Sequence, residues 1–432
     1  MSFSFAFSWT TAGLGALLLL ATGFQARAQS SSEDLDQVRV RLNHQSAVER
    51  VEVRVEDGPL AVQVPEGGAP VMRLQSGETT TLGVRQQEVS LQRGTRGLYA
   101  TELTLRPTGD DASWSLSFDD GESKTFTGGL YLAPAPEQTS TLLVVNEVPI
   151  EDYVASVVAS EYGLDDREGT KAMAVVARTY GLFASEKFGG AYDQADGTAS
   201  QVYEGADAVT DRSRRATEAT AGEVLTYNEN LIQAVYFSSS GGHTASNEDV
   251  WKADDSIPYL RGKEDPYDSS SPHHNWSATV DRSSLLQALT RNRSTLVDGF
   301  TIDERAPHGR VRTINVLQSS GPDHTMNANA FRLTVNRGVA GAPLKSTWFD
   351  ARRQGNQYVF NGHGFGHGVG LSQYGAHEMA DRGKSYREIL RFYYTSVEIE
   401  TLNDVEFDPV SAPVAKDPRP SPSDSTDRRI GW

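Results

Sequence analysis

Eleven residues near the C-terminus combine chemistry-bearing side chains with a high density of glycine. Segment 364–374 reads Gly-Phe-Gly-His-Gly-Val-Gly-Leu-Ser-Gln-Tyr. Alternating glycines let the backbone approach a ligand or another backbone closely. His367, Gln373 and Tyr374 add hydrogen-bond donors and acceptors to the same stretch. Because folding alone rarely demands that combination, we interpret the segment as one wall of a binding site.

One glutamate is a candidate for acid–base chemistry. Val154, Val157, Val158 and Glu161 follow helical spacing, which aligns the carboxyl group with the apolar face of a helix. Burial among apolar neighbours would disfavour the ionised form and raise the pKa, as a general acid near neutral pH requires. Alternatively, Glu161 is the last residue of its helix and simply extends into water. The pattern alone leaves both interpretations open.

The next predicted helix, 168–187, carries Arg178 and Tyr180. Arg178 shares a face with apolar residues, so we expect a specific partner for its guanidinium group. Each helical residue turns by about 100°, which places Tyr180 about 200° away from Arg178. One of the two side chains is therefore expected to be structural.

A loop rich in small polar residues, Ser-Ser-Ser-Gly-Gly-His-Thr at 238–244, follows an apolar strand and is suited to holding a polar ligand. A serine nucleophile is disfavoured, because the pattern Gly-x-Ser-x-Gly is absent. His243, His363 and His367 lie in glycine-rich loops and make a metal site conceivable. The chain has no cysteine and no His-Glu-x-x-His motif, so we expect no metal and no cofactor. We expect these histidines to hydrogen-bond to a ligand or to loop backbone.

The pattern of apolar residues predicts an α+β protein. Short alternating runs separated by turn residues indicate a small β-rich domain at 37–135. Residues 140–400 mix both element types and form the predicted core domain. We expect helices at 152–161, 168–187, 212–221, 284–290 and 385–394, and strands at 142–145, 223–227, 231–237, 311–316 and 331–335. The composition of 409–432, with little apolar content, predicts a disordered tail.

The start of the chain and its charge bear on location and partners. An apolar run at 12–24, followed by Ala-Arg-Ala at 26–28, predicts a signal peptide at 1–28. The run is too short to span a membrane comfortably, although a short anchor is the alternative. We therefore expect an exported protein of the periplasm, cell envelope or extracellular space, without a stable membrane span after cleavage. The formal charge of −17 argues against binding nucleic acid or an anionic membrane.

Several segments together resemble the SpoIID/LytB family of bacterial cell-wall proteins. The resemblance covers residues 140–400, and its motifs stand at 146–154, 158–161, 171–180, 201–205, 238–244 and 366–376. The sequence differs from the family's usual motifs in two places. Glu161 is followed by Tyr162 and Gly163 where the family usually has Met-Pro, which could alter the site beside the acid. The serine loop lacks the cysteine through which some members bind zinc, so that site should be absent.

The resemblance implies a lytic transglycosylase that acts on peptidoglycan, typically on glycan strands stripped of stem peptides. Glu161 would be the general acid and base that cleaves the MurNAc–GlcNAc bond and forms 1,6-anhydro-MurNAc. The substrate-binding residues would be Arg178, Tyr180, Gln201, Tyr203, Ser239, Ser240, His243, His367, Gln373 and Tyr374. The alternative is a non-catalytic amidase enhancer, which binds peptidoglycan and stimulates a cell-wall amidase as its partner.

Overall fold

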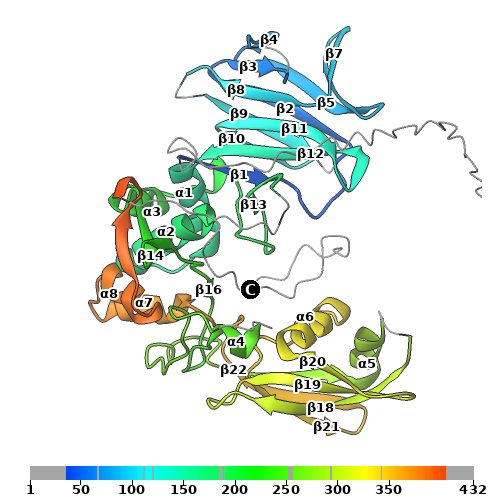
Figure 1. Ribbon diagram of the computed structural model, residues 1–432, viewed down its shortest axis with the longest axis vertical. Coiled ribbons are helices and arrows are strands. Elements are labelled where there is room, and N and C mark those ends of the chain that lie inside the picture. Colours follow the sequence, from blue (N-terminus) through cyan, green and yellow to red (C-terminus); the bar gives the residue numbers. More distant parts are fainter. Residues whose placement is uncertain are drawn as a thin grey trace, which may run out of the picture.

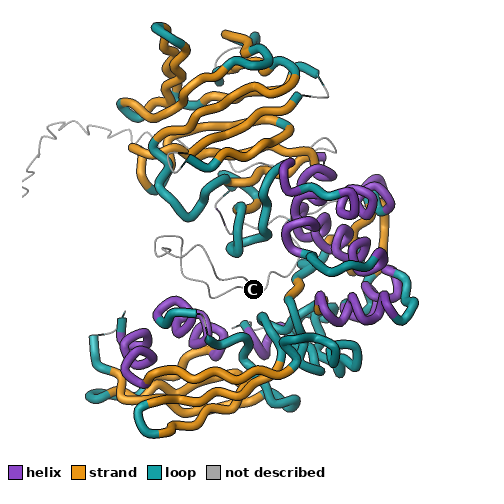
Figure 2. Tube along the Cα trace, turned by 180° about the vertical axis from the view of Figure 1, so that it is seen from behind, coloured by secondary structure: helices purple, strands orange, loops and turns teal. Residues whose placement is uncertain are grey.

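A computed structural model describes residues 36–404, apart from 66–67, 110–111, 119–120, 184–187, 189, 252–255, 292–293 and 342. The expected signal peptide at 1–28 and tail at 409–432 lie outside the described residues. Figure 1 shows a β-rich lobe at the top, a helical layer at one side and a second sheet-containing lobe at the bottom. Figure 2 shows the same arrangement from behind. The α+β class and the β-rich N-terminal region are confirmed.

The N-terminal lobe consists of two sheets whose apolar side chains face inward. Alternation along the strands produces this, because successive side chains point to opposite faces: Val51, Val53 and Val55 are buried while their neighbours are not. The seven-stranded sheet has the order β13-β1-β12-β11-β8-β3-β4 and the six-stranded sheet β10-β9-β2-β5-β6-β7. The strands are β1 (Gln37–Arg41), β2 (Arg50–Asp57), β3 (Leu60–Gln63), β4 (Met72–Leu74), β5 (Thr79–Arg85), β6 (Glu88–Arg93), β7 (Arg96–Ala100), β8 (Leu103–Pro107), β9 (Ser113–Phe118), β10 (Ser123–Thr127), β11 (Gly129–Ala135), β12 (Gln138–Pro149) and β13 (Gln194–Ala195).

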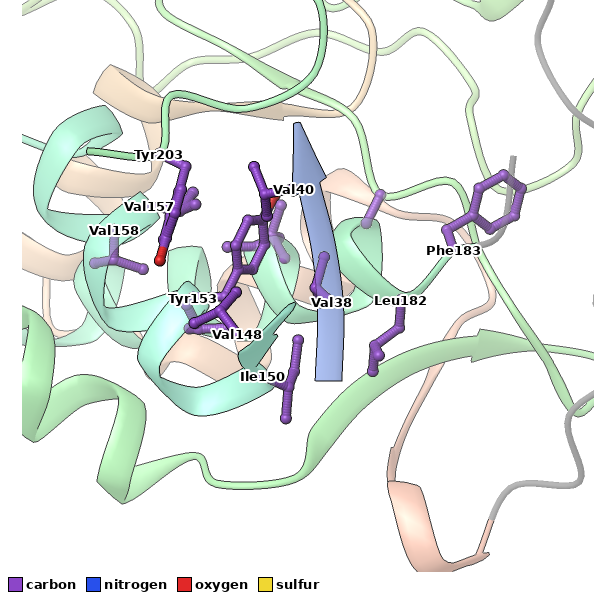
Figure 3. Close-up of a cluster of buried hydrophobic side chains, with 14 of the residues drawn as sticks. Val38, Val40, Val148, Ile150, Tyr153, Val157, Val158, Leu182, Phe183 and Tyr203 are labelled. Atoms are coloured by element: carbon purple, nitrogen blue, oxygen red, sulfur yellow. The ribbon is translucent and has the colours of Figure 1, made fainter. Parts of the chain in front are cut away.

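Strand β12 joins this lobe to the helical layer. The strand expected at 142–145 belongs to β12, which pairs antiparallel with β1 and β11. The boundary proposed between 135 and 140 therefore falls within one continuous sheet. Helix α1 (Ile150–Glu161) begins directly after β12. Figure 3 shows Val38 and Val40 of β1 packed beside Tyr153 of α1 and Tyr203, so the lobe and the helices share a core.

The helical layer carries α1 and the segments that surround its C-terminal end. Side-chain caps explain where several helices begin, since a polar side chain satisfies free N–H groups of the first turn. Asp166 caps α2, Ser372 caps α7, and Thr210 and Ser385 form capping boxes at α3 and α8. The further elements are α2 (Arg167–Leu182), η3 (Ala206–Ala208), α3 (Asp211–Ala219), β14 (Glu223–Tyr227), β15 (Asn230–Leu231), β16 (Tyr236–Phe237), α4 (Asn247–Val250), β23 (Leu371–Ser372), α7 (Gln373–Asp381), α8 (Tyr386–Tyr393), β24 (Glu398–Thr401) and η4 (Leu402–Asp404).

Residues 275–363 form the bottom lobe of Figure 1, which we call the insertion lobe. It has its own hydrophobic core, which includes Phe300, Phe331 and Phe360. Two three-stranded sheets and two helices enclose this core, so 140–400 contains more than one packing unit. The elements are β17 (Asn275–Asp281), α5 (Arg282–Thr290), β18 (Val297–Arg305), β19 (Val311–Gln318), β20 (His324–Asn327), α6 (Ala328–Gly338), β21 (Phe349–Gln354) and β22 (Gln357–His363).

The strand expected at 331–335 is wrong, because this segment lies within α6. The Asn327 side chain accepts hydrogen bonds from the N–H groups of Asn329 and Ala330 and starts the helix. Phe331 and Val335, one turn apart, are both buried on one face. The strand expected at 231–237 is formed only at its two ends. Across the described residues, every helix is too short or too polar to cross a membrane.

Candidate functional site

Glu161 is the last residue of α1, and three segments meet around it. The side chain is half-buried. Its Oε1 accepts the backbone N–H of Val202 at 2.8 Å. Its backbone carbonyl accepts the side-chain amide of Gln373, the first residue of α7, at 3.0 Å. The end of α1 is therefore clamped and its carboxyl group is oriented by the backbone of a neighbouring segment.

Behind Glu161 lies a chain of buried polar groups. The Tyr153 hydroxyl donates to Gln201 Oε1 at 2.9 Å, and Gln201 Nε2 donates to the Tyr236 hydroxyl at 3.2 Å. Burial raises the pKa of both Tyr153 and Tyr236 well above the ordinary value, and the nearby charge of Glu161 adds to each shift. Both tyrosines therefore stay protonated. Tyr180, which is half-buried, also adds to both shifts.

The residue after Glu161, Tyr162, anchors the end of α1. Its hydroxyl donates to Asp166 Oδ2 at 2.7 Å. Asp166 also accepts the N–H of Gly169 and lies 2.8 Å from Nδ1 of His377 on α7. This carboxylate thus ties together the end of α1, the start of α2 and α7, which fixes the direction in which Glu161 projects.

A buried carboxylate, Asp268, organises the serine loop. Its Oδ1 accepts the N–H of Ser240 at 2.7 Å and the hydroxyl of Ser372 at 3.2 Å. Its Oδ2 accepts the N–H of Gly241 at 2.8 Å and the hydroxyl of Ser239 at 2.9 Å. Ser239 and Ser240 are fully buried, so the structure gives both a role in holding the loop in place of the expected contact with substrate. Sequence reasoning missed Asp268, because an aspartate in a turn-rich segment carries no signal of long-range contacts.

The alternating glycines allow close backbone approach, but the approach is to other parts of the protein. Gly370 has a φ of 80°, and a Cβ added there would lie 2.0 Å from the carbonyl oxygen of Val235. At Gly368, with a φ of 90°, a Cβ would lie 2.6 Å from Cζ of Arg310. Arg310 is fully buried and donates to the carbonyl oxygen of Ser240 at 2.8 Å. Burial lowers the pKa of this guanidinium to about 10, which still leaves it charged at neutral pH.

The histidines of these loops also make internal contacts. His367 is buried, with its ring centroid 5.5 Å from that of Phe237 and 5.3 Å from that of Trp251. His243 stacks on His308 with centroids 4.4 Å apart. Within the described residues, histidine and carboxylate side chains nowhere form a group of three that could hold a metal ion.

Two further predicted contacts with substrate are replaced by buried interactions. Arg178 is fully buried and pairs with both carboxylate oxygens of Glu151, with Nε 2.9 Å from Oε1. Tyr203 is buried beside Tyr153, as Figure 3 shows, and donates to Asn146 Oδ1 at 2.7 Å. Both side chains position α1 and α2 from behind and do not reach the surface near Glu161. Of the pair on α2, Arg178 is therefore the structural residue.

Tyr374, the residue after Gln373, is half-buried and faces a group that sequence reasoning missed. Its ring centroid lies 5.7 Å from that of His273, and the His273 centroid lies 5.0 Å from that of Phe365. Lys345 Nζ lies 3.1 Å from Nδ1 of His273. Phe365 and Tyr374 belong to the glycine-rich segment 364–374, but no spacing in the sequence links them to His273 and Lys345, which come from two separate loops.

Comparisons with known proteins match two stretches of the chain. Residues 138–227 match the family model described as Stage II sporulation protein, and residues 263–370 match a domain of unknown function. The chain is 32% identical over 276 residues to Stage II sporulation protein D of Bacillus amyloliquefaciens, covering 59% of this chain and 75% of that protein. It is 32% identical over 292 residues to an uncharacterized protein of Brachyspira hyodysenteriae, covering 66% and 75%. It is 30% identical over 272 residues to an amidase enhancer of Bacillus subtilis, covering 52% of this chain and 37% of that protein.

Proposed function

The chain belongs to the Stage II sporulation protein D family, and we propose that it is an exported peptidoglycan lytic transglycosylase with Glu161 as general acid and base. The observation that carries this proposal is the setting of Glu161. The carboxyl group is half-exposed, is oriented by the N–H of Val202, and ends a helix that Gln373 clamps. A carboxyl group held in this way can transfer a proton to a bound glycan.

In the proposed reaction, Glu161 first acts as an acid. It donates its proton to the oxygen between MurNAc and GlcNAc, the C1–O bond breaks, and positive charge develops at C1 of MurNAc. The Glu161 carboxylate then takes the proton of the C6 hydroxyl of the same sugar as its oxygen bonds to C1. The products are 1,6-anhydro-MurNAc and a free GlcNAc hydroxyl, and the acid is regenerated. One carboxyl group suffices because no water is activated, whereas ordinary glycosidases use two.

The buried groups behind Glu161 support this role. Tyr153, Gln201 and Tyr236 form a hydrogen-bonded chain of uncharged groups. Such a chain fixes side chains without adding a competing charge near the acid. Tyr180 and Tyr374 are half-buried and available to glycan, and we retain both as substrate-binding residues.

The test compares the unchanged protein with Glu161→Gln on peptidoglycan stripped of stem peptides, with products identified by mass spectrometry. We expect anhydro-muramyl fragments from the unchanged protein and a rate at least about 100-fold lower from the variant, because general acid–base catalysis contributes about 10²–10⁴-fold. Glu218→Gln, at an exposed position of α3, is the matched control and should keep full activity. Reducing-end products would contradict the proposal, because they require water as the nucleophile.

The similarity to an amidase enhancer supports a second candidate, a non-catalytic protein that stimulates a cell-wall amidase. The same two proteins, mixed with such an amidase and intact peptidoglycan, distinguish the candidates. Stimulated release of stem peptides by both proteins, without glycan cleavage by either, would favour the enhancer.

A further inference from the structure

A partly exposed surface extends from the Glu161 site to the insertion lobe. It consists of Tyr374, Phe365, His273 and Lys345, which we call the Lys345 surface; all four side chains are half-buried. The His273 ring meets the rings of Phe365 and Tyr374 edge-on, at interplanar angles of 80° and 85°. Tyr374 directly follows Gln373, whose amide reaches the carbonyl of Glu161. Tyr374 is therefore one residue away from the side chain that clamps the end of α1.

Lys345 is held in place by contacts of its backbone. Its carbonyl oxygen accepts the N–H of Gly366 at 2.9 Å and a guanidinium N–H of Arg332 at 3.0 Å. The first bond ties the insertion lobe to the glycine-rich segment, and the second ties Lys345 to α6. These bonds fix the backbone, and the contact of Nζ with His273 Nδ1 orients the ammonium group, which lowers the entropic cost of binding a ligand.

Among the described residues, the partner of the Lys345 ammonium group is uncharged. Within the described part of the chain, Lys345 makes no ion pair with a carboxylate, although the formal charge of the whole chain is −17. Its partner is Nδ1 of His273. Burial lowers the pKa of His273, and the charge of Lys345 lowers it further, so the ring stays neutral. A neutral imidazole whose Nδ1 accepts a hydrogen bond orients the ammonium group without cancelling its charge.

We propose that Lys345, presented by the insertion lobe beside His273 and Tyr374, binds a carboxylate of the peptidoglycan strand. This inference rests on the proposed function. An ammonium group forms a charge-assisted hydrogen bond with a carboxylate, while the rings of Phe365 and Tyr374 offer apolar faces to sugar. The insertion lobe thus completes the substrate site.

Two carboxylates of peptidoglycan have this chemistry. One is the lactyl carboxylate of MurNAc, which is free only where the stem peptide has been removed, since otherwise it forms an amide bond. The other is a carboxylate of the stem peptide itself. Recognition of the first would make the protein prefer stripped strands, and recognition of the second would make it prefer substituted ones.

The test measures binding in full-length protein that carries Glu161→Gln, so that cleavage does not interfere. Lys345→Gln removes the charge, Lys345→Arg keeps it, and Lys384→Gln is the control, since Lys384 is 42% exposed and paired with Glu388. Dissociation constants are measured for three ligands: soluble stripped strands, the same strands with their carboxylates converted to amides, and strands that retain stem peptides.

We expect Lys345→Gln to weaken binding to a carboxylate-bearing strand about tenfold, as loss of one hydrogen bond to a charged group predicts. The Lys345→Arg and Lys384→Gln proteins should bind like the parent, and amidated strands should bind equally to all four. A loss on stripped strands identifies the lactyl carboxylate, and a loss confined to substituted strands identifies the stem peptide. Equal binding of Lys345→Gln and its parent to both charged strands would overturn the proposal, as would an absence of binding. Because binding is measured without cleavage, inactivity of the protein with Glu161 intact would overturn the proposed reaction and leave this result standing.

Discussion

Asp268→Asn is expected to destabilise the protein more than its small change in size suggests. The carboxylate is fully buried and receives backbone N–H groups on both of its oxygens: Ser240 donates to Oδ1 and Gly241 to Oδ2. An asparagine has one carbonyl oxygen and one NH₂ group. Whichever way the amide is turned, one of the two N–H groups faces an NH₂ group.

The cost follows from this count. A backbone N–H is left without an acceptor, and one buried unsatisfied donor costs about 1–3 kcal/mol. The hydroxyls of Ser239 and Ser372 can rotate to follow the new amide, so they add little. The free energy of unfolding should therefore fall by about 1–3 kcal/mol.

The assay is urea unfolding followed by tryptophan fluorescence. Asp350→Asn is the matched control, because Asp350 is 79% exposed and its ion pair with Arg305 lies at the surface. That variant should lose less than about 1 kcal/mol. A loss of less than about 1 kcal/mol for Asp268→Asn, with an unchanged dependence on urea, would refute the reasoning that this carboxylate holds the loop.

Two further predictions concern the same region. Gly368→Ala and Gly383→Ala both place a side chain at positive φ, of 90° and 80°, but only the first brings Cβ against Arg310, at 2.6 Å. Gly383→Ala should cost about 1–3 kcal/mol from backbone strain, and Gly368→Ala about 1–3 kcal/mol more from the clash; equal urea midpoints would contradict this. Burial raises the pKa of Asp265 from the ordinary 3.8 to about 6. The folded state then holds a proton that the unfolded state releases, so stability falls as the pH rises from about 4 to 6, by about 3 kcal/mol in total. Asp265→Asn should flatten that part of the profile, and parallel profiles from urea unfolding at pH 4 to 7 would show that Asp265 is not responsible.

Much of the fold could be predicted because the pattern of apolar residues in the sequence agrees with the burial of those residues in the structure. The alternation around Val51, Val53 and Val55 is retained in β2, and the capped, apolar-faced segments form α3, α5 and α8. The prediction failed at 331–335, where β-branched and aromatic residues resemble a strand but the cap at Asn327 starts a helix. The pairing of β12 with β1 and the separate core of the insertion lobe could not be predicted, since both depend on contacts distant in sequence.

For the site, sequence identified segments better than individual roles. The motifs around Glu161, the serine loop and the glycine-rich segment all converge, as Gln373, Ser372 and Asp268 show. Arg178, which we expected at the substrate site, is buried and pairs with Glu151. The residue type alone does not reveal which side of a helix faces solvent. Lys345 carried no signal at all, since its importance comes from contacts with His273.

The chain enters and leaves the insertion lobe at neighbouring points, and this bears on how the lobe can change during evolution. Asn275 and His363, its first and last residues, are paired on neighbouring strands β17 and β22. A segment whose two ends are adjacent can be lengthened, shortened or exchanged between genes without displacing the rest of the domain. Its core is assembled from its own residues, so such a segment can also fold as one unit before it docks. Sequence changes in the insertion lobe would then alter which substrate the protein recognises, while the position of Glu161 on α1 stays the same.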